Sequence, residues 1–240
     1  MALETSTPAR RRFARPAALV VLMLVVGALS YAVVAPPNGP RSLKRFDAAR
    51  MADLELRMWQ AYYEKDRVRL FALLVTTLRE QYRYSWAVAA LEGFHLARAA
   101  ARFSDLQSNY DAVLPDLEAA YGTARAWLGA GFEPAAVARA ELAWWVARRT
   151  PGRNDTATVA GLIADEYELL YETSRDLVML PAQLRAEAAA LRDANAASPD
   201  WDTIGRLLQE SYAALSRALS TQYARDGPAE AGHYVLVPNP

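Results

Sequence analysis

A run of nineteen residues without a charged side chain, Ala17–Ala35, constrains this 240-residue chain more than any other feature. At a rise of 1.5 Å per residue, a helix of this length spans about 28 Å, which matches the hydrocarbon core of a bilayer. The run is apolar on every helical face, and Pro36 and Pro37 end it. We therefore predict a membrane anchor. Its predicted membrane-contacting residues include Leu19, Val20, Leu22, Leu24 and, at the interface, Tyr31.

Arginines flank this segment unevenly and indicate its orientation. Arg10, Arg11, Arg12 and Arg15 precede it, whereas fewer and more widely spaced basic residues follow it. Positively charged flanks tend to stay on the cytoplasmic side of a membrane. The pattern therefore predicts a single-pass protein of the bacterial inner membrane, with a cytoplasmic N-terminus and a periplasmic helical domain.

The same segment also fits an export signal. Ser30-Tyr31-Ala32 has the small-x-small pattern of a signal-peptide cleavage site, and Arg10-Arg11-Arg12-Phe13 resembles a twin-arginine signal. Apolar residues continue past the candidate cleavage site as far as Ala35, however, and this favours an uncleaved anchor. An exported soluble protein is the alternative.

Beyond the anchor, apolar residues recur every three or four positions, and no stretch shows the sustained alternation of a strand. The sequence predicts an all-α fold, in which one transmembrane helix is followed by an antiparallel bundle of about seven helices with short connections. The residues from 47 to 84 form one helix, or two that separate near 64–66. Further helices are predicted at 86–103, 106–128, 134–149, 156–180, 181–196 and 200–225.

These patterns divide the chain into consecutive parts. We predict a basic cytoplasmic tail at residues 1–15, the transmembrane anchor at 16–35, a proline-rich spacer at 36–46, the helical domain at 47–225 and a C-terminal tail at 226–240. Short polar side chains are predicted to cap the helix starts, namely Asp47, Ser85 and either Asn154 or Asp155.

Composition excludes several classes of site. The chain has no cysteine, and therefore no disulfide, thiolate metal site or cysteine nucleophile. Its net charge is zero, and the basic N-terminus leaves the rest of the chain mildly acidic, which argues against nucleic acid as a partner. The motifs of phosphate-binding loops, dinucleotide-binding folds, zinc proteases and serine hydrolases are missing. We therefore predict no cofactor and favour a protein that is not an enzyme.

Glu92 and His95 form an E-x-x-H pattern on a predicted helix, which places a carboxylate and an imidazole on one face. Ferritin-like di-iron bundles carry this motif on two helices and take single glutamates from two others. The candidates for those single glutamates are Glu55 or Glu64, then Glu141, and one of Glu166, Glu168 and Glu172. The other histidine, His233, falls in the predicted tail, so the helical domain lacks the second motif. A membrane-tethered di-iron carboxylate protein is thus an alternative hypothesis.

The stretch from 140 to 149 combines adjacent tryptophans with adjacent arginines. Neighbouring residues on a helix point about 100° apart, so the two indoles cannot both face one core. Tryptophan and arginine dominate the hot spots of protein interfaces. We therefore predict a partner-binding surface made of Trp144, Trp145, Arg148 and Arg149. The alternative is that Glu141 pairs internally with an arginine of this helix.

These observations favour a membrane-anchored, non-enzymatic scaffold or accessory subunit of a membrane protein complex, whose partners are the lipid bilayer and another protein. A third hypothesis is a helical ligand-binding module with an aromatic groove. It is based on two further aromatic clusters, one at residues 59–63 and one at residues 82–86. This hypothesis predicts a large apolar pocket near Trp59 or Trp144.

Overall fold

The computed structural model describes residues 11–226, and the side chains of 11–18, 20, 21 and 223–226 lie outside the described set. Within this range the structure has nine α-helices, one short 3-10 helix and no strand, which confirms the all-α prediction for these residues. The elements are α1 (Arg11–Val34), α2 (Ala48–Tyr63), α3 (Arg67–Tyr82), α4 (Trp86–Asp105), η1 (Tyr110–Val113), α5 (Leu114–Leu128), α6 (Pro134–Arg149), α7 (Thr156–Tyr171), α8 (Arg175–Ala194) and α9 (Trp201–Asp226).

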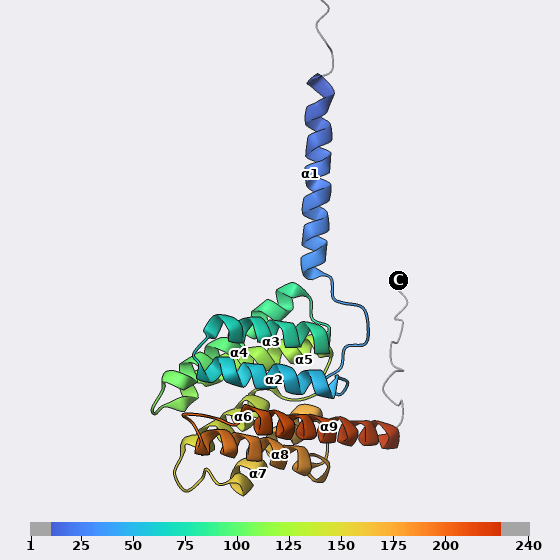
Figure 1. Cartoon of the computed structure of the whole chain (residues 1–240). Helices are drawn as coiled ribbons and strands as arrows, with labels where there is room; N and C mark the ends of the chain where they lie inside the picture. The colour runs from blue at the N-terminus through green and yellow to red at the C-terminus, as the bar shows by residue number, and fades with distance from the viewer. Residues whose placement is uncertain (1–10, 227–240) are drawn as a thin grey trace, which may run out of the picture.

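The eight helices after α1 form a closed ring. Each of α2 to α8 packs against the helix that follows it in the chain, and α9 returns to pack against α2. Figure 1 shows α2 to α5 in one layer, on the side from which α1 projects, and α6 to α9 in a second layer. The short connections explain this order, because they leave consecutive helices as neighbours. The ring surrounds a central space, which all eight helices line.

Capping side chains begin the helices where the sequence predicts them. Asp47, Ser85 and Asp155 each accept a hydrogen bond from the backbone N–H three residues later. This bond satisfies a donor that has no partner within the first turn of a helix. The helix Pro134–Arg149 has the predicted bounds, and its proline occupies the first turn, where no backbone N–H is needed.

The segment predicted at 47–84 is two helices. Lys65 adopts a left-handed conformation with φ of 58°, which ends α2, and Asp66 caps α3 by accepting from the Arg69 N–H. The ring therefore has eight helices rather than about seven. The predicted helix at 106–128 is also shorter, since α5 begins only at Leu114, with Pro115 in its first turn.

The predicted helix boundary at Pro181 is wrong. Pro181 lies inside α8, and the chain turns earlier, at Glu172, whose φ of 47° is left-handed. A proline inside a helix removes one backbone hydrogen bond. The helix continues past Pro181 because it packs against α7 and α9. Ser211 of α9 also donates a hydrogen bond to the Pro181 carbonyl at 2.8 Å. Because these contacts come from distant segments, the local sequence does not reveal them.

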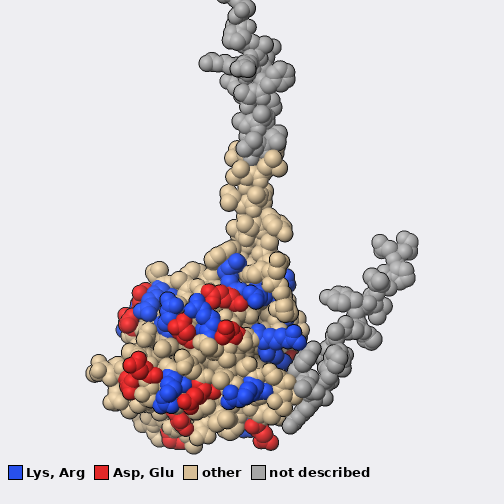
Figure 2. Space-filling model, turned by 45° about the vertical axis from the view of Figure 1, so that its right-hand side comes forward, with Lys and Arg blue, Asp and Glu red and all other residues tan. Residues whose placement is uncertain are grey.

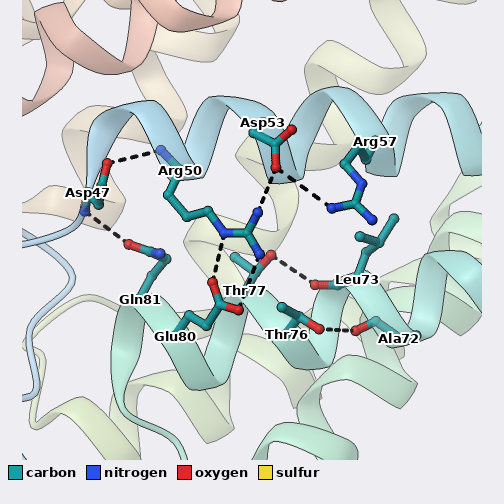
Figure 3. Close-up of polar contacts among 10 residues, drawn as sticks. All are labelled: Asp47, Arg50, Asp53, Arg57, Ala72, Leu73, Thr76, Thr77, Glu80 and Gln81. Atoms are coloured by element: carbon teal, nitrogen blue, oxygen red, sulfur yellow. Dashed lines mark hydrogen bonds and ion pairs between the residues drawn. The ribbon is translucent and has the colours of Figure 1, made fainter.

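Polar contacts on the outer surface join α2 to α3 (Figure 3). Arg50 donates from Nε to Glu80 at 2.8 Å and from Nη1 to Asp53 at 2.7 Å. The Asp47 N–H donates to the Gln81 side chain at 2.9 Å. Exposed pairs of this kind contribute about 0 to 1 kcal/mol each, so they help to fix how the two helices align rather than stabilise the fold strongly.

Apolar packing between the ring helices carries the main stabilisation. The largest buried cluster extends from α2 to α9, and its fully buried members include Ile163 of α7, Val178 of α8 and Leu208 of α9. Buried alanines, among them Ala160 and Ala182, let α7 and α8 approach closely. Burial of each large aliphatic side chain contributes about 1.5 to 3 kcal/mol.

Helix α1 projects away from the ring (Figure 1), and its described side chains are exposed along the helix. Met23, Leu24 and Tyr31 are 65%, 67% and 72% exposed. A search of the described residues finds no helix that is both long and apolar enough to cross a membrane. The predicted anchor includes Val20 and other residues whose side chains lie outside the described set, as do nearly all of the two predicted tails.

We expect Ile163→Ala to lower the free energy of unfolding by about 2 to 5 kcal/mol, because it leaves a cavity in the largest buried cluster. Chemical denaturation followed by circular dichroism measures this change. Val68→Ala is the matched control, since Val68 is 80% exposed and its loss should change stability by less than about 0.5 kcal/mol. Equal effects of the two substitutions would contradict the core described above.

Candidate functional site

A cavity of about 510 Å³ lies within the ring, and side chains from all eight helices α2 to α9 line it. This volume is in the range of about 300 to 1,000 Å³ that is typical of small-molecule sites. The wall combines aliphatic and aromatic residues with a small number of charged ones. Four glutamates come from four different helices, namely Glu55 of α2, Glu92 of α4, Glu141 of α6 and Glu166 of α7.

Glu55 is the fully partnered carboxylate of this wall. Its Oε1 accepts hydrogen bonds from Arg185 Nη2 at 2.6 Å and Nε at 2.9 Å, and from Trp59 Nε1 at 3.0 Å. Its Oε2 accepts a hydrogen bond from the Tyr212 hydroxyl. A buried charge is tolerated when a counter-ion and several hydrogen bonds replace water, and Glu55 has both.

Glu141 and Glu166 form a second acidic group, on the neighbouring helices α6 and α7. The Tyr121 hydroxyl donates to Glu141 at 2.9 Å, and Trp144 Nε1 donates to Glu166 at 2.5 Å. Neither carboxylate has an ion pair within the part of the chain that the structure describes. Burial raises the pKa of both, the charge of Glu166 raises the pKa of Glu141 further, and Arg185 opposes the shift at Glu166.

Glu92 is the least satisfied carboxylate of the wall. It is 5% exposed, and neither its Oε2 nor the buried Tyr84 hydroxyl has a hydrogen-bond partner among the described residues. Burial raises the pKa of Glu92 to about 8, and the nearby Tyr84 hydroxyl opposes this shift without meeting the geometry of a hydrogen bond. A buried polar group without a hydrogen bond costs about 1 to 3 kcal/mol. Two such groups close together, on Glu92 and Tyr84, therefore indicate a place where a further polar group could bind.

One end of the cavity lies next to Arg149, whose side chain is exposed to solvent. Arginines and tyrosines surround this end. Arg148 Nη2 donates to the Tyr63 hydroxyl at 2.7 Å and to Asp193 at 2.8 Å. Arg149 donates to the Tyr62 hydroxyl at 2.9 Å and to a backbone carbonyl of α4 at 2.7 Å. These contacts bring together the carboxyl-terminal parts of α2, α4, α6 and α8 and form the rim of the cavity.

The four residues predicted as a partner-binding surface all belong to the cavity wall. Trp144 is buried, and Trp145 is half-buried, with its ring centroid 6.1 Å from that of Trp144. Arg148 and Arg149 form the rim. The expected pairing of Glu141 with an arginine of its own helix is wrong, because Arg148 pairs with an aspartate of α8 and Glu141 accepts from a tyrosine.

The residues of the metal hypothesis are not brought together as a set. Glu92, Glu55 and Glu141 line the cavity, whereas His95 Nδ1 lies 3.2 Å from Asp116 of α5. A spacing of three residues separates side chains by about 60° around a helix. This angle is enough for Glu92 to face the cavity while His95 faces α5. Among the described residues, no group of three or more histidine, aspartate or glutamate side chains is arranged to hold a metal ion.

Sequence reasoning missed Arg185 as a residue of this wall, and it considered Glu166 only as one of three alternative metal-ligating glutamates. A usable signal was present, because Glu166 shares the apolar stripe of α7 with Ile163 and Tyr167 at helical spacing. Arg185 lies in the same way on the buried face of α8, three residues after Ala182. A charged residue inside an apolar stripe indicates either a buried ion pair or a ligand contact.

We expect Glu92→Gln to raise the free energy of unfolding above pH 8 and to change it little at pH 5. The pKa of Glu92 in the folded protein, about 8, exceeds the value of about 4.3 expected when unfolded. The folded state therefore holds the extra proton between these values, and stability falls as pH rises through this window. Glutamine does not ionise and lacks this loss. Thermal unfolding from pH 5 to pH 9 measures the difference.

Glu168→Gln is the control for this experiment, since Glu168 is an exposed glutamate of α7 and the substitution changes the charge equally. If the stability difference between Glu92→Gln and the unaltered protein is the same at every pH, the burial described for Glu92 is contradicted.

Comparisons of the chain with protein-family models, with curated proteins and with solved structures find no match, so its function has to be argued from the cavity itself.

Proposed function

We propose that this chain is a membrane-tethered helical protein whose ring of helices binds a small organic molecule in its central cavity. One observation carries the proposal. The cavity of about 510 Å³ contains a buried carboxylate oxygen and a tyrosine hydroxyl, on Glu92 and Tyr84, that lack any partner among the described residues. Unpartnered polar atoms on an otherwise aromatic wall are typical of a binding site.

The size of the cavity argues against a packing defect. Protein interiors are close-packed, and voids larger than a water molecule are few. At about 24 cal/mol per Å³, a dry cavity of 510 Å³ would cost about 12 kcal/mol, which is comparable to the whole stability of a typical domain. A space of this size is therefore expected to hold water or a ligand, and a ligand would gain affinity by displacing water from the aromatic side chains.

The proposed membrane tether is helix α1. Its described residues from Leu22 to Val34 are uncharged and exposed, and Figure 2 shows no charged side chain on this part of the helix. An isolated helix with apolar side chains on every face is stable only when an apolar medium covers it. The arginines that precede it support a cytoplasmic N-terminus in a bacterial inner membrane and a periplasmic ring.

A role as an accessory subunit is the second candidate. It is supported by Trp86, Leu91 and Phe94, which are exposed apolar residues on α4, the ring helix that α1 contacts. Large exposed apolar residues on one helix are a common feature of protein contacts. The ligand-binding proposal is preferred because Trp144, the central residue of the predicted partner surface, lies inside the cavity wall.

We expect native mass spectrometry of the full chain, purified from its host, to show a bound organic molecule. Ala100→Phe should remove it, because Ala100 lines the cavity and a phenyl ring at this position fills part of the space. Ala87→Phe is the control, since Ala87 is an exposed residue of the same helix. Circular dichroism verifies that both variants are folded. A chain that carries no bound molecule and gains no thermal stability from any compound of a screening library would refute the proposal.

We expect the full chain to remain with membranes after an alkaline wash, and the double variant Leu24→Arg, Val26→Arg to be released. Each arginine near the centre of a membrane helix costs about 2.5 to 3.5 kcal/mol. Val68→Arg serves as the control because it places an arginine on an exposed position of α3. The tether is ruled out if the unaltered chain is found in the soluble fraction after cell lysis.

A further inference from the structure

We infer that the ligand of this cavity carries an organic cation, a protonated amine or a quaternary ammonium group, which binds between Glu141 and Glu166. The inference rests on the proposed ligand-binding function and adds the chemical class of the ligand. It follows from the charges of the cavity wall, from the free acceptors of the two carboxylates and from the aromatic rings beside them.

The charges of the inner wall are not balanced. Four described arginines line the cavity, and Arg185 is the one that pairs with a glutamate of the wall, Glu55 at 2.6 Å. The rim arginines do not balance the remaining carboxylates. Arg148 and Arg192 both pair with Asp193, and Arg149 bonds a tyrosine and backbone carbonyls. Glu92, Glu141 and Glu166 therefore have no ion pair among the described residues, and Arg185 acts on Glu141 and Glu166 only at longer range. A positively charged ligand would supply the missing ion pair.

The hydrogen bonds of Glu141 and Glu166 leave acceptors free on the two neighbouring helices. Each carboxylate receives one donor on Oε2, from Tyr121 and from Trp144 respectively. The Oε1 atom of each has no hydrogen bond of good geometry from a described residue, the Tyr121 hydroxyl also lies near Glu166, and both glutamates line the cavity. An ammonium group has up to three donors and no acceptor, and bonds between charged partners are roughly twice as strong as neutral ones.

Aromatic rings beside these carboxylates already stabilise a cation. The Arg185 guanidinium lies 5.1 Å from the ring centre of Trp144 and 5.9 Å from that of Tyr167. Both rings line the cavity, and Trp144 is the donor to Glu166. Rings of tryptophan and tyrosine attract cations through their negative faces, and sites for quaternary ammonium ligands use such rings.

A negatively charged ligand, a neutral ligand and a metal ion each fit the cavity wall less well than an organic cation. An anion would be repelled by Glu92, Glu141 and Glu166 in their ionised forms, strongly so in a medium of low dielectric constant, and would hold them protonated. A neutral molecule would leave the imbalance of charge uncorrected. A bound metal ion lacks a set of three suitable ligands within the described part of the chain. Burial also raises the pKa of Glu141 and Glu166, which indicates that their charge lacks compensation when the cavity is empty.

The test compares three compounds that share one skeleton and differ in charge, namely 4-phenylbutylamine, 4-phenylbutan-1-ol and 4-phenylbutyrate. Isothermal titration calorimetry of the full chain in lipid nanodiscs measures each affinity at pH 8, with empty nanodiscs as the blank. We expect the amine to bind about tenfold more tightly than the alcohol or the acid. The double variant Glu141→Gln, Glu166→Gln should lose this preference, and Glu168→Gln should keep it.

The outcomes separate the two proposals. If the alcohol or the acid binds as tightly as the amine, ligand binding stands and the cationic class is overturned. If none of the three compounds binds although the chain carries a bound molecule from its host, the cationic class is overturned and ligand binding stands. If the chain also carries no bound molecule, the proposed function itself is contradicted. A double variant that still prefers the amine would overturn the assignment to Glu141 and Glu166. Glu141→Gln alone, which keeps an acceptor for Tyr121, provides the same comparison if the double variant does not fold.

Discussion

The ion pair between Arg185 and Glu55 is the interaction on which the polar interior depends. It joins α8 to α2, and the Tyr212 hydroxyl of α9 bonds the same glutamate, so the last two helices are tied to the first helix of the ring. Removing one partner of a buried pair costs about 3 to 5 kcal/mol, because the other charge is left uncompensated. The pair also sets the character of the site. Because Arg185 pairs with Glu55, the other three glutamates of the wall, Glu92, Glu141 and Glu166, have no ion pair among the described residues.

The closed ring explains why these carboxylates lie in a hollow and not in a packed core. Each helix is covered on two sides by its neighbours, and the side chains that point to the axis do not fill it. Burying Glu92, Glu141 and Glu166 lowers the stability of the empty protein, as their raised pKa values indicate. Buried polar groups that weaken a fold are characteristic of binding sites, where a ligand supplies the missing interactions. The proposed ligand would account for both the cavity and the unpaired charges.

Local signals accounted for much of the helical architecture and for little of the site. Capping by Asp47 and Ser85 and the first-turn Pro134 identified helix starts, because these effects depend on a few neighbouring residues. The boundary predicted at Pro181 was wrong because packing from α7 and α9 holds α8 through the proline. The aromatic-groove hypothesis named Trp144 as a pocket residue, and it lines the cavity, whereas the partner-surface hypothesis treated the same residue as exposed. Helical spacing shows which residues share a face and does not show what that face contacts.

The sequence by itself determined the helical class, most helix ends and the apolar character of the segment before the ring, since each depends on residues that are close in the chain. Only the tertiary structure decided which charges face inward. Glu166 lines the cavity while Glu168 is exposed, and Glu92 and His95 contact different helices. The contact of Tyr212 with Glu55 joins residues far apart in the chain and exists only once α9 returns to α2. The physical reason is that a buried charge is stable only beside its partner, and the packing of the eight helices brings the partners together.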